Sequence, residues 1–277
     1  MIQDIGPHRL YNQFDPAATP EDGDTVLLLS GGTVAAKLSE KTLAFPKVRD
    51  FAAEARARLI YLFRVDEERF FLCTGEDALP EGFAMTDLRT VRQAEPEPKY
   101  LVFAALTGKH LADWYRDTRF CGRCGTPTVP SEKERARICP ACGNTAYPRI
   151  MPAVIAGVID GDRILLTRYN RPGAYNALIA GFTEIGETLE ETVAREVMEE
   201  AGLKVKNIRY YKSQPWGVAN DILTGFFCDL DGSDEIVLDA NELKSAVWTK
   251  REDIVLQPDR TSLTNEMMER FKSGEPC

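Results

Sequence analysis

The 277-residue chain lacks the sequence signals of membrane insertion and of export. No apolar run approaches the ~20 residues that a membrane-spanning helix needs. The first ten residues are mixed polar and apolar, without the charged-then-apolar layout of a signal peptide. No internal repeat or low-complexity tract is present either. These absences predict a cytoplasmic protein with no membrane partner.

A surplus of basic residues is missing as well. The chain has 34 Lys and Arg against 43 Asp and Glu, a net charge of −9 and a pI near 5.0. This balance disfavours loose binding to nucleic acid or to anionic membranes. The exclusion is weak for an enzyme, because bridging metal ions can bring an anionic substrate to an acidic pocket. With 44% hydrophobic residues, the chain is long enough for two domains.

The seven cysteines divide into two groups. Three are isolated and are interpreted as reduced thiols: Cys73, Cys228 and Cys277. The other four form two CxxC pairs with 14 residues between them: Cys121 and Cys124, then Cys139 and Cys142. Four thiolates complete a closed tetrahedral zinc site. A disulfide pair is disfavoured in a reducing cytoplasm, and a redox CxxC would not need duplication. The pattern predicts a structural zinc ribbon, a module that also occurs in nucleic-acid binders.

Residues 188–201 contain strong helix formers and neither Pro nor Gly. Apolar side chains recur at helical spacing and should pack inward: Leu189, Val193, Val197 and Met198. Three carboxylates stand at i, i+3 and i+4 on one patch of this helix: Glu196, Glu199 and Glu200. Their repulsion could be offset by hard divalent cations, which prefer oxygen ligands. A simple solvated face is the alternative for a Glu-rich helix. Gly202 suits a helix C-cap with positive φ.

Residues 181–203 fill every fixed position of the Nudix box, G-x5-E-x7-R-E-U-x-E-E-x-G-U with U aliphatic. These are Gly181, Glu187, Arg195, Glu196, Val197, Glu199, Glu200, Gly202 and Leu203. The chain therefore resembles a Nudix hydrolase, a family that cleaves diphosphates linked to nucleosides with the help of metal ions.

The resemblance implies roles for the residues of the box. Glu196, Glu199 and Glu200 would bind Mg²⁺ or Mn²⁺, with Glu200 or Glu196 activating water. Glu187 and Arg195 would form an internal ion pair that fixes the loop-helix-loop shape. The carbonyl of Ala180 would be the non-carboxylate ligand. The metals would neutralise the diphosphate and lower the pKa of a water.

The order of elements predicts an α+β chain in three parts. Strands are expected at 26–29, 59–65 and 69–73, with a hairpin turn at 66–68, and a polar Pro-rich linker follows at 94–99. A helix should then bury Leu111, Trp114 and Tyr115. Later strands are expected at 154–159, 163–168, 177–180, 208–213, 222–230 and 246–249, and a helix at 261–272 should bury Leu263, Met267, Met268 and Phe271. We expect an N-terminal mixed α/β domain (1–117), a zinc ribbon (118–146) and a Nudix α/β/α sandwich (147–273).

Ten residues beyond the box the chain reads Ser213-Gln214-Pro215-Trp216. With the ribbon and the following Tyr147-Pro148-Arg149, this resembles the NADH pyrophosphatase branch, which is marked by S-Q-P-W-P-F-P-x-S. The chain departs from the branch at residues 217–221, where Gly-Val-Ala-Asn-Asp replaces P-F-P-x-S. We expect Gly217 to make this loop flexible. Asp221 is expected to repel phosphate or to form a hydrogen bond with a ribose.

Further site residues follow from the resemblance. Phe182 and Tyr147 are expected to stack on a base, which is worth ~1–3 kcal/mol, although either could belong to the core. Glu242 would be an additional metal ligand, and surface exposure is its alternative. The remaining expected substrate contacts are Gln214, Pro215, Trp216, Asp221, Thr264, Arg89 and Glu134.

The leading hypothesis is hydrolysis of NAD(H) to AMP and nicotinamide mononucleotide. Removal of NAD caps from RNA 5′ ends is a second, and another substrate such as ADP-ribose is a third. A non-catalytic zinc-ribbon module with a vestigial Nudix fold is the rival from another class, although the four box carboxylates oppose it. The resemblance also implies a homodimer.

Overall fold

The computed structural model describes residues 1–74 and 78–277, which form two compact units. One unit comprises residues 3–149 and 217–220, and the other comprises residues 1–2, 150–216 and 221–277. The ribbon thus shares a unit with the N-terminal residues, and a separate domain boundary at residue 118 stays a prediction. Within the described ranges, no helix is long and apolar enough to cross a membrane.

The N-terminal unit is built on a seven-stranded sheet of order β1-β5-β6-β2-β3-β4, with β7 paired to β3. The strands are β1 (Leu10–Tyr11), β2 (Thr25–Ser30), β3 (Thr33–Leu38), β4 (Leu43–Ala44), β5 (Ile60–Val65), β6 (Glu68–Cys73) and β7 (Ala84–Asp87). The helical segments are a 3₁₀ turn (Val48–Asp50), α1 (Ala53–Arg56), α2 (Leu88–Gln93) and α3 (Tyr100–Asp117). Three short strands, β8 (Val129–Pro130), β9 (Arg137–Ile138) and β10 (Thr145–Ala146), form the ribbon's own sheet.

The expected strands of this unit are confirmed as β2, β5 and β6. Val65 pairs with Glu68, so the hairpin turn is one residue tighter than expected. The sequence did not indicate β1 and β4, which have two residues each, or β3 and β7, which contain few β-branched side chains. The expected core positions of α3 (Leu111, Trp114 and Tyr115) are all buried.

The second unit contains a six-stranded mixed sheet of order β14-β15-β11-β12-β16, with β13 paired to β11. Its strands are β11 (Met151–Asp160), β12 (Arg163–Tyr169), β13 (Ile179–Phe182), β14 (Val205–Trp216), β15 (Asp221–Leu230) and β16 (Leu243–Lys250). Its helical segments are α4 (Leu189–Ala201), a 3₁₀ turn (Arg251–Asp253) and α5 (Leu263–Ser273). The parallel pair β11–β15 makes the sheet mixed, as expected.

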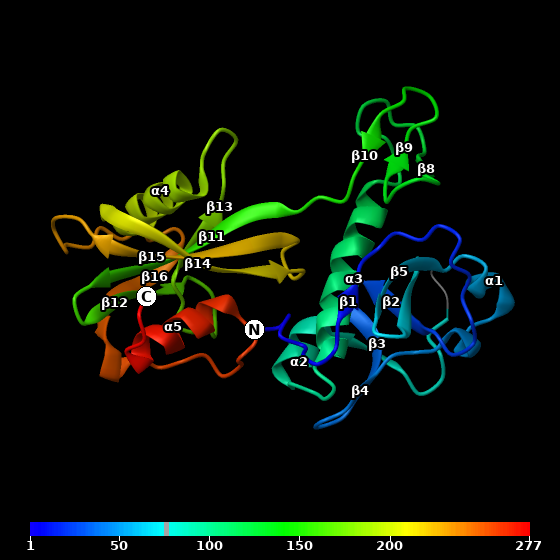
Figure 1. Cartoon of the computed structure of the whole chain (residues 1–277), viewed down its shortest axis with the longest axis horizontal. Helices are drawn as coiled ribbons and strands as arrows, with labels where there is room; N and C mark the ends of the chain where they lie inside the picture. Colours follow the sequence, from blue (N-terminus) through cyan, green and yellow to red (C-terminus); the bar gives the residue numbers. More distant parts are fainter. Residues whose placement is uncertain (75–77) are drawn as a thin grey trace. The chain divides into compact units, whose positions relative to one another are not determined.

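Helices α4 and α5 cover opposite faces of this sheet (Figure 1). The alternation of β11 explains the arrangement, because successive strand residues face opposite sides. Val154 packs in the core under α4, and Ile155 packs in the core under α5. The four apolar residues expected to face inward from α5 are fully buried. The α/β/α sandwich is confirmed, but Met198 of α4 is 40% exposed, so its expected burial is wrong.

The SQPW motif belongs to a strand and not to a loop. Strand β14 runs on to Trp216, which pairs with Asp221 at the start of β15. Pro215 is tolerated there because β14 is an edge strand, where a missing N–H removes no necessary ladder bond. The connection between the two strands is therefore only residues 217–220.

Candidate active site

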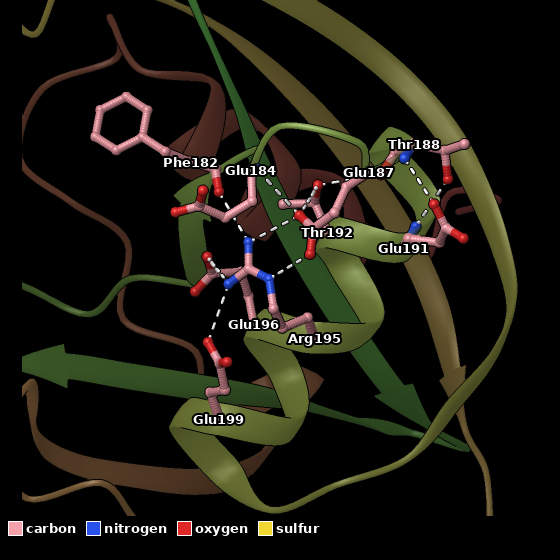
Figure 2. Close-up of polar contacts among 9 residues, drawn as sticks. All are labelled: Phe182, Glu184, Glu187, Thr188, Glu191, Thr192, Arg195, Glu196 and Glu199. Atoms are coloured by element: carbon pink, nitrogen blue, oxygen red, sulfur yellow. Dashed lines mark hydrogen bonds and ion pairs between the residues drawn. The ribbon is translucent and has the colours of Figure 1, made fainter.

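Helix α4 is fixed at both ends by local chemistry. Thr188 accepts a hydrogen bond from the backbone N–H of Glu191, and the Glu191 carboxylate accepts one from the N–H of Thr188 (Figure 2). This reciprocal capping satisfies two N–H groups that the first turn leaves without partners. At the other end Gly202 has φ of +68°, which confirms the expected C-cap. Both ends of the helix that carries the carboxylates are thereby fixed.

Arg195 is the centre of the polar network in Figure 2. Its Nε donates to Glu187 Oε1 over 2.6 Å, and its Nη2 donates to the carbonyl of Phe182 over 2.9 Å. The ion pair expected from the resemblance is therefore present, and it ties the loop to the helix. The Arg195 hydrogen bond and the N–H of Glu184 lower the pKa of Glu187 to about 2. Glu187 is therefore a permanent anion at neutral pH, which suits an anchor for Arg195.

The same guanidinium also holds two of the proposed metal ligands. Its Nη1 donates to Glu196 Oε1 over 2.7 Å and to Glu199 Oε2 over 3.0 Å. The resemblance implies only the pair of Arg195 with Glu187. Arg195 thus lowers the repulsion between the two carboxylates and fixes their direction.

Gly181 is required by the position of Glu196. A Cβ at residue 181 would lie 2.0 Å from Glu196 Cδ, closer than any non-bonded contact allows. The carboxylate of α4 thus lies directly against the backbone of β13, beside Ala180. The first glycine of the box therefore makes room for a carboxylate.

Glu200 carries the clearest sign of a missing positive partner. The side chain is 2% exposed, and neither carboxylate oxygen has a hydrogen-bond partner among the described residues. Burial, followed by the charges of Glu196 and Glu242, raises the pKa of Glu200 to about 8. A buried carboxylate without a donor is costly. A hard cation would satisfy both oxygens, so these residues fit a divalent metal.

The acidic cluster is less compact than a finished metal site. Within the part of the chain that the structure describes, the only group of three or more side chains placed to hold a metal ion is the four cysteines, whose sulfur atoms lie within 4.8 Å of one another. Arg195 holds Glu196 and Glu199, while Glu242 is exposed just before β16. The ligand roles of the four glutamates and of the Ala180 carbonyl stay predictions.

Two neighbours of this cluster were not predicted from the sequence. The backbone N–H of Asp239 donates to the carbonyl of Glu200 over 3.1 Å, and the charge of Asp239 adds to the field on Glu200. Burial, followed by the negative charge of Glu200, raises the pKa of Tyr169 in β12 to about 12. Neither residue lies in the box, so no local signal indicated it.

The two CxxC pairs converge as predicted. Sulfur atoms lie 3.6 Å apart for Cys121 and Cys142, and 3.4 Å apart for Cys124 and Cys139. A tetrahedral site with Zn–S bonds of ~2.3 Å places its sulfurs ~3.8 Å apart, so the four thiolates fit zinc. The glycine after each pair has positive φ, +75° at Gly125 and +70° at Gly143. Both turns therefore depend on glycine.

Two expected substrate contacts meet in the N-terminal unit. The Tyr147 hydroxyl donates to Glu134 Oε1 over 2.9 Å, and the Tyr147 ring is 53% exposed. Phe182, in the other unit, is 50% exposed, and its ring points away from the Arg195 network (Figure 2). Arg89 is exposed in the first turn of α2, where its backbone N–H bonds to the capping Asp87. Their contacts with substrate stay predictions.

Gln214 lies in a different environment from the one expected of a substrate contact. It is fully buried; its Nε2 donates to the carbonyl of Thr261 over 2.9 Å, and its Oε1 accepts from the N–H of Leu263 over 2.8 Å. The amide thus ties β14 to the start of α5, where Thr264 is partly exposed. In this geometry Gln214 positions backbone, whereas Pro215 is exposed and Trp216 is partly buried.

The turn at residues 217–220 packs on α3, in contrast to the loose loop that Gly217 predicts. Lys109 of α3 donates from Nζ to the carbonyl of Val218 over 2.8 Å, and Asn220 Nδ2 donates to Asp113 over 3.0 Å. A Cβ on Gly217 would lie 2.1 Å from the carbonyl oxygen of Leu106. The glycine permits close packing here and does not loosen the turn. Asp221 is 4% exposed, so its carboxylate faces little solvent.

Comparison with known families and proteins agrees with this geometry. Residues 149–271 match the family described as NUDIX domain, and residues 116–147 match the NADH pyrophosphatase zinc ribbon domain. A curated protein of Citrobacter koseri named NAD-capped RNA hydrolase NudC is 42% identical over 184 residues, 66% of this chain and 71% of that protein. The protein of the same name from Salmonella typhi is 43% identical over 185 residues, with the same coverage.

A solved structure of a Nudix hydrolase from Nitrosomonas europaea also resembles the chain. It is 23% identical, and the alignment has a TM-score of 0.49 and covers 57% of this chain and 95% of that one.

Proposed function

Because the chain belongs to the Nudix hydrolase family, with the zinc ribbon of the NADH pyrophosphatases, we propose that it hydrolyses the diphosphate of NAD(H). The products would be AMP and nicotinamide mononucleotide, and the required metal would be Mg²⁺ or Mn²⁺. Zn²⁺ would have only a structural role at the four cysteines.

The observation that carries the proposal is the state of Glu200. It is buried, neither of its oxygens has a donor within residues 1–74 and 78–277, and it is close enough to Glu196 and Glu242 for their charges to raise its pKa. A merely solvated acidic face would leave its carboxylates exposed and hydrated. This arrangement therefore supports a cation site on α4 and opposes a vestigial fold.

The residues of the chain divide the remaining work. Glu196, Glu199, Glu200 and Glu242 would hold the cation, which supplies positive charge to the diphosphate and acidifies water. Arg195 keeps Glu196 and Glu199 aimed at that position, and Glu187 anchors Arg195. The exposed ring of Phe182 is placed on the strand that carries Ala180 and Gly181, where a base can stack on it.

A substrate panel tests the proposal. Purified protein should release AMP and nicotinamide mononucleotide from NADH or NAD⁺ only when Mg²⁺ or Mn²⁺ is present. ADP-ribose should be the poorer substrate, because it lacks the nicotinamide. Chromatography of the products identifies the bond that is cut. A preference for ADP-ribose would mean that the enzyme acts on another substrate of the same family. No cleavage of any substrate would contradict the proposal.

Removal of NAD caps from RNA is the second candidate, and the ribbon segment favours it. Residues 116–149 contain seven Arg or Lys against three Asp or Glu, a basic island in an acidic chain. The two curated relatives are themselves named NAD-capped RNA hydrolases. If RNA is the substrate, kcat/KM on capped RNA should exceed that on NADH at low salt and fall steeply as salt rises.

We further propose a homodimer, which the resemblance implies, and a cytoplasmic location, which the sequence predicts. Light scattering of the purified protein at micromolar concentration tests the first. A monomer that turns over NADH at the full rate would contradict a need for both subunits.

A further inference from the structure

A cavity of about 460 Å³ opens beside the end of strand β12. Part of its wall is the tight turn Arg171-Pro172-Gly173-Ala174. A 3.3 Å hydrogen bond from the N–H of Ala174 to the carbonyl of Arg171 closes this turn. Pro172 and Gly173, with φ of +68°, occupy the two central positions that suit proline and a positive-φ glycine. The wall is therefore shaped before any ligand arrives. The volume of the cavity is in the range of small-molecule sites.

Three cations line this cavity: Arg168, Arg171 and Lys244. Within residues 1–74 and 78–277, none of them forms an ion pair with a carboxylate. By contrast, Arg163 at the other end of the same strand binds both Asp160 and Asp234. Arg168 donates from Nε to the side-chain carbonyl of Asn176 over 2.8 Å, and Arg171 lies over the ring of Tyr169, 5.4 Å from its centroid; neither partner carries a negative charge. Cations gathered in this way repel one another, and an anion would relieve the repulsion.

A break in strand pairing brings Lys244 to this position. Arg168 pairs with Ser245, whereas the next residue, Tyr169, pairs with Leu243. Lys244 is the extra residue of this bulge. Bulges redirect a side chain and are frequent next to active sites. The lysine is therefore turned toward the cavity by backbone geometry.

The cavity lies next to the acidic cluster but does not belong to it. Asn170 in its lining donates from its backbone N–H to the carbonyl of Glu242 over 3.0 Å. Tyr169 faces the side of the sheet covered by α4, because Leu165, four residues earlier, packs in the core under α4. Arg168 follows Leu166, which packs under α5, so it faces the opposite side. A diphosphate at the carboxylates would leave these three cations free for another group.

We propose that this cavity binds a second phosphate of the substrate, carried on the ribose of the adenosine and separate from the diphosphate that is cleaved. The inference rests on the proposed function, since it takes the adenosine half from NAD(H). Two sources share this chemistry. A 3′-phosphate represents the next nucleotide of a capped RNA, and a 2′-phosphate represents a phosphorylated dinucleotide.

Equilibrium binding of three ligands to the full-length protein in Mg²⁺ tests the inference. AMP, adenosine 3′,5′-bisphosphate and adenosine 2′,5′-bisphosphate differ only in the second phosphate, and none contains the bond to be cleaved. One of the bisphosphates should bind roughly tenfold more tightly than AMP. A preference for the 3′-phosphate identifies RNA as the source, and a preference for the 2′-phosphate identifies a dinucleotide.

Variants assign the preference to the cavity. The relevant ratio is the affinity for the preferred bisphosphate divided by the affinity for AMP. Lys244→Ala and Arg171→Ala should bring this ratio close to one, and Lys244→Glu should take it below one. Lys250→Ala, an exposed lysine on the same strand outside the cavity, should keep the full ratio. Equal affinity for all three ligands in the wild type, or a ratio unchanged in the lysine and arginine variants, would overturn the proposal. Because no turnover is measured, failure to hydrolyse NADH would reject the proposed function without deciding this result.

Discussion

The zinc ribbon and the acidic cluster are both expected to hold metal ions, but they are assembled in different ways. In the ribbon, backbone turns bring four sulfur atoms within 4.8 Å of one another. In the cluster, Arg195 holds Glu196 and Glu199, and Glu200 has no hydrogen-bond donor among the described residues. The first arrangement is closed on all sides and suits a structural ion. In the second, both carboxylate oxygens of the buried Glu200 lack donors among the described residues, as expected of a site that has a cation still to bind.

The largest effect that would test this contrast is loss of the ribbon itself. Cys139 is 1% exposed, and Cys139→Ser removes one of the four thiolates. We expect loss of bound zinc and unfolding of the ribbon, since zinc contributes roughly 10 kcal/mol or more to the folding of small zinc modules. Metal analysis and hydrogen exchange over residues 121–145 measure both. Cys277→Ser is the matched control, and protection that persists without zinc would refute the structural role.

A change in the acidic cluster should instead lower the activity of the enzyme without unfolding it. Gly181→Ala places a methyl group where the Glu196 carboxylate lies, so the carboxylate must move. A displacement of about 1 Å at a reacting centre costs on the order of 100-fold in rate. We expect kcat/KM on NADH to fall by about that factor. Gly23→Ala, where an added Cβ meets nothing within 4 Å, serves as control. Wild-type turnover by Gly181→Ala would show that Glu196 is not needed in that place.

The lack of a partner for Glu200 predicts a stability cost that depends on pH. Its pKa is about 8 in the folded, metal-free protein and near 4.5 when unfolded. The cost is absent below pH 4.5 and grows as the pH rises toward 8, because the folded state disfavours the charged form. Glu200→Gln should therefore raise the free energy of unfolding by roughly 2 kcal/mol at pH 8 without divalent metal, and by much less at pH 5. Denaturant titrations at the two pH values provide the comparison, and equal effects at both would argue against the shifted pKa.

The smallest expected effect concerns the turn at residues 217–220. Gly217→Ala forces its Cβ against the carbonyl of Leu106, and overpacking of this kind costs about 1–3 kcal/mol. Thermal unfolding of the N-terminal unit should shift down by a few degrees. Gly32→Ala, at a position with free space, should not shift it. An unchanged midpoint for Gly217→Ala would restore the interpretation of this segment as a flexible loop.

Local features of the fold could be read from the sequence. The C-cap of α4, its length and the Glu187–Arg195 pair implied by the resemblance all depend on residues within 16 positions of one another. The apolar spacing of α5 is equally local, and all four expected core residues are buried. The expected burial of Met198 is wrong because this residue lies beyond the edge of the buried face of α4. The apolar spacing alone does not locate that edge.

Features that depend on distant pairings could not be predicted. Gln214 is buried because β14 meets the start of α5, almost 50 residues later. Gly217 is needed because its turn packs on α3, more than 100 residues earlier. Lys244 reaches its cavity through a bulge against β12, which has no signature in the sequence. The branch resemblance directed attention to residues 213–221 but could not say which of them face substrate.

The most direct test of the account is NADH turnover by Glu200→Gln, measured while Mn²⁺ is titrated. Glu190→Gln, an exposed glutamate in the first turn of the same helix, is the matched control. We predict that Glu200→Gln binds Mn²⁺ more weakly and loses at least 1000-fold in kcat, while Glu190→Gln keeps both. Turnover by Glu200→Gln within tenfold of the wild type, at any Mn²⁺ concentration, would contradict the assignment of α4 as the catalytic metal site.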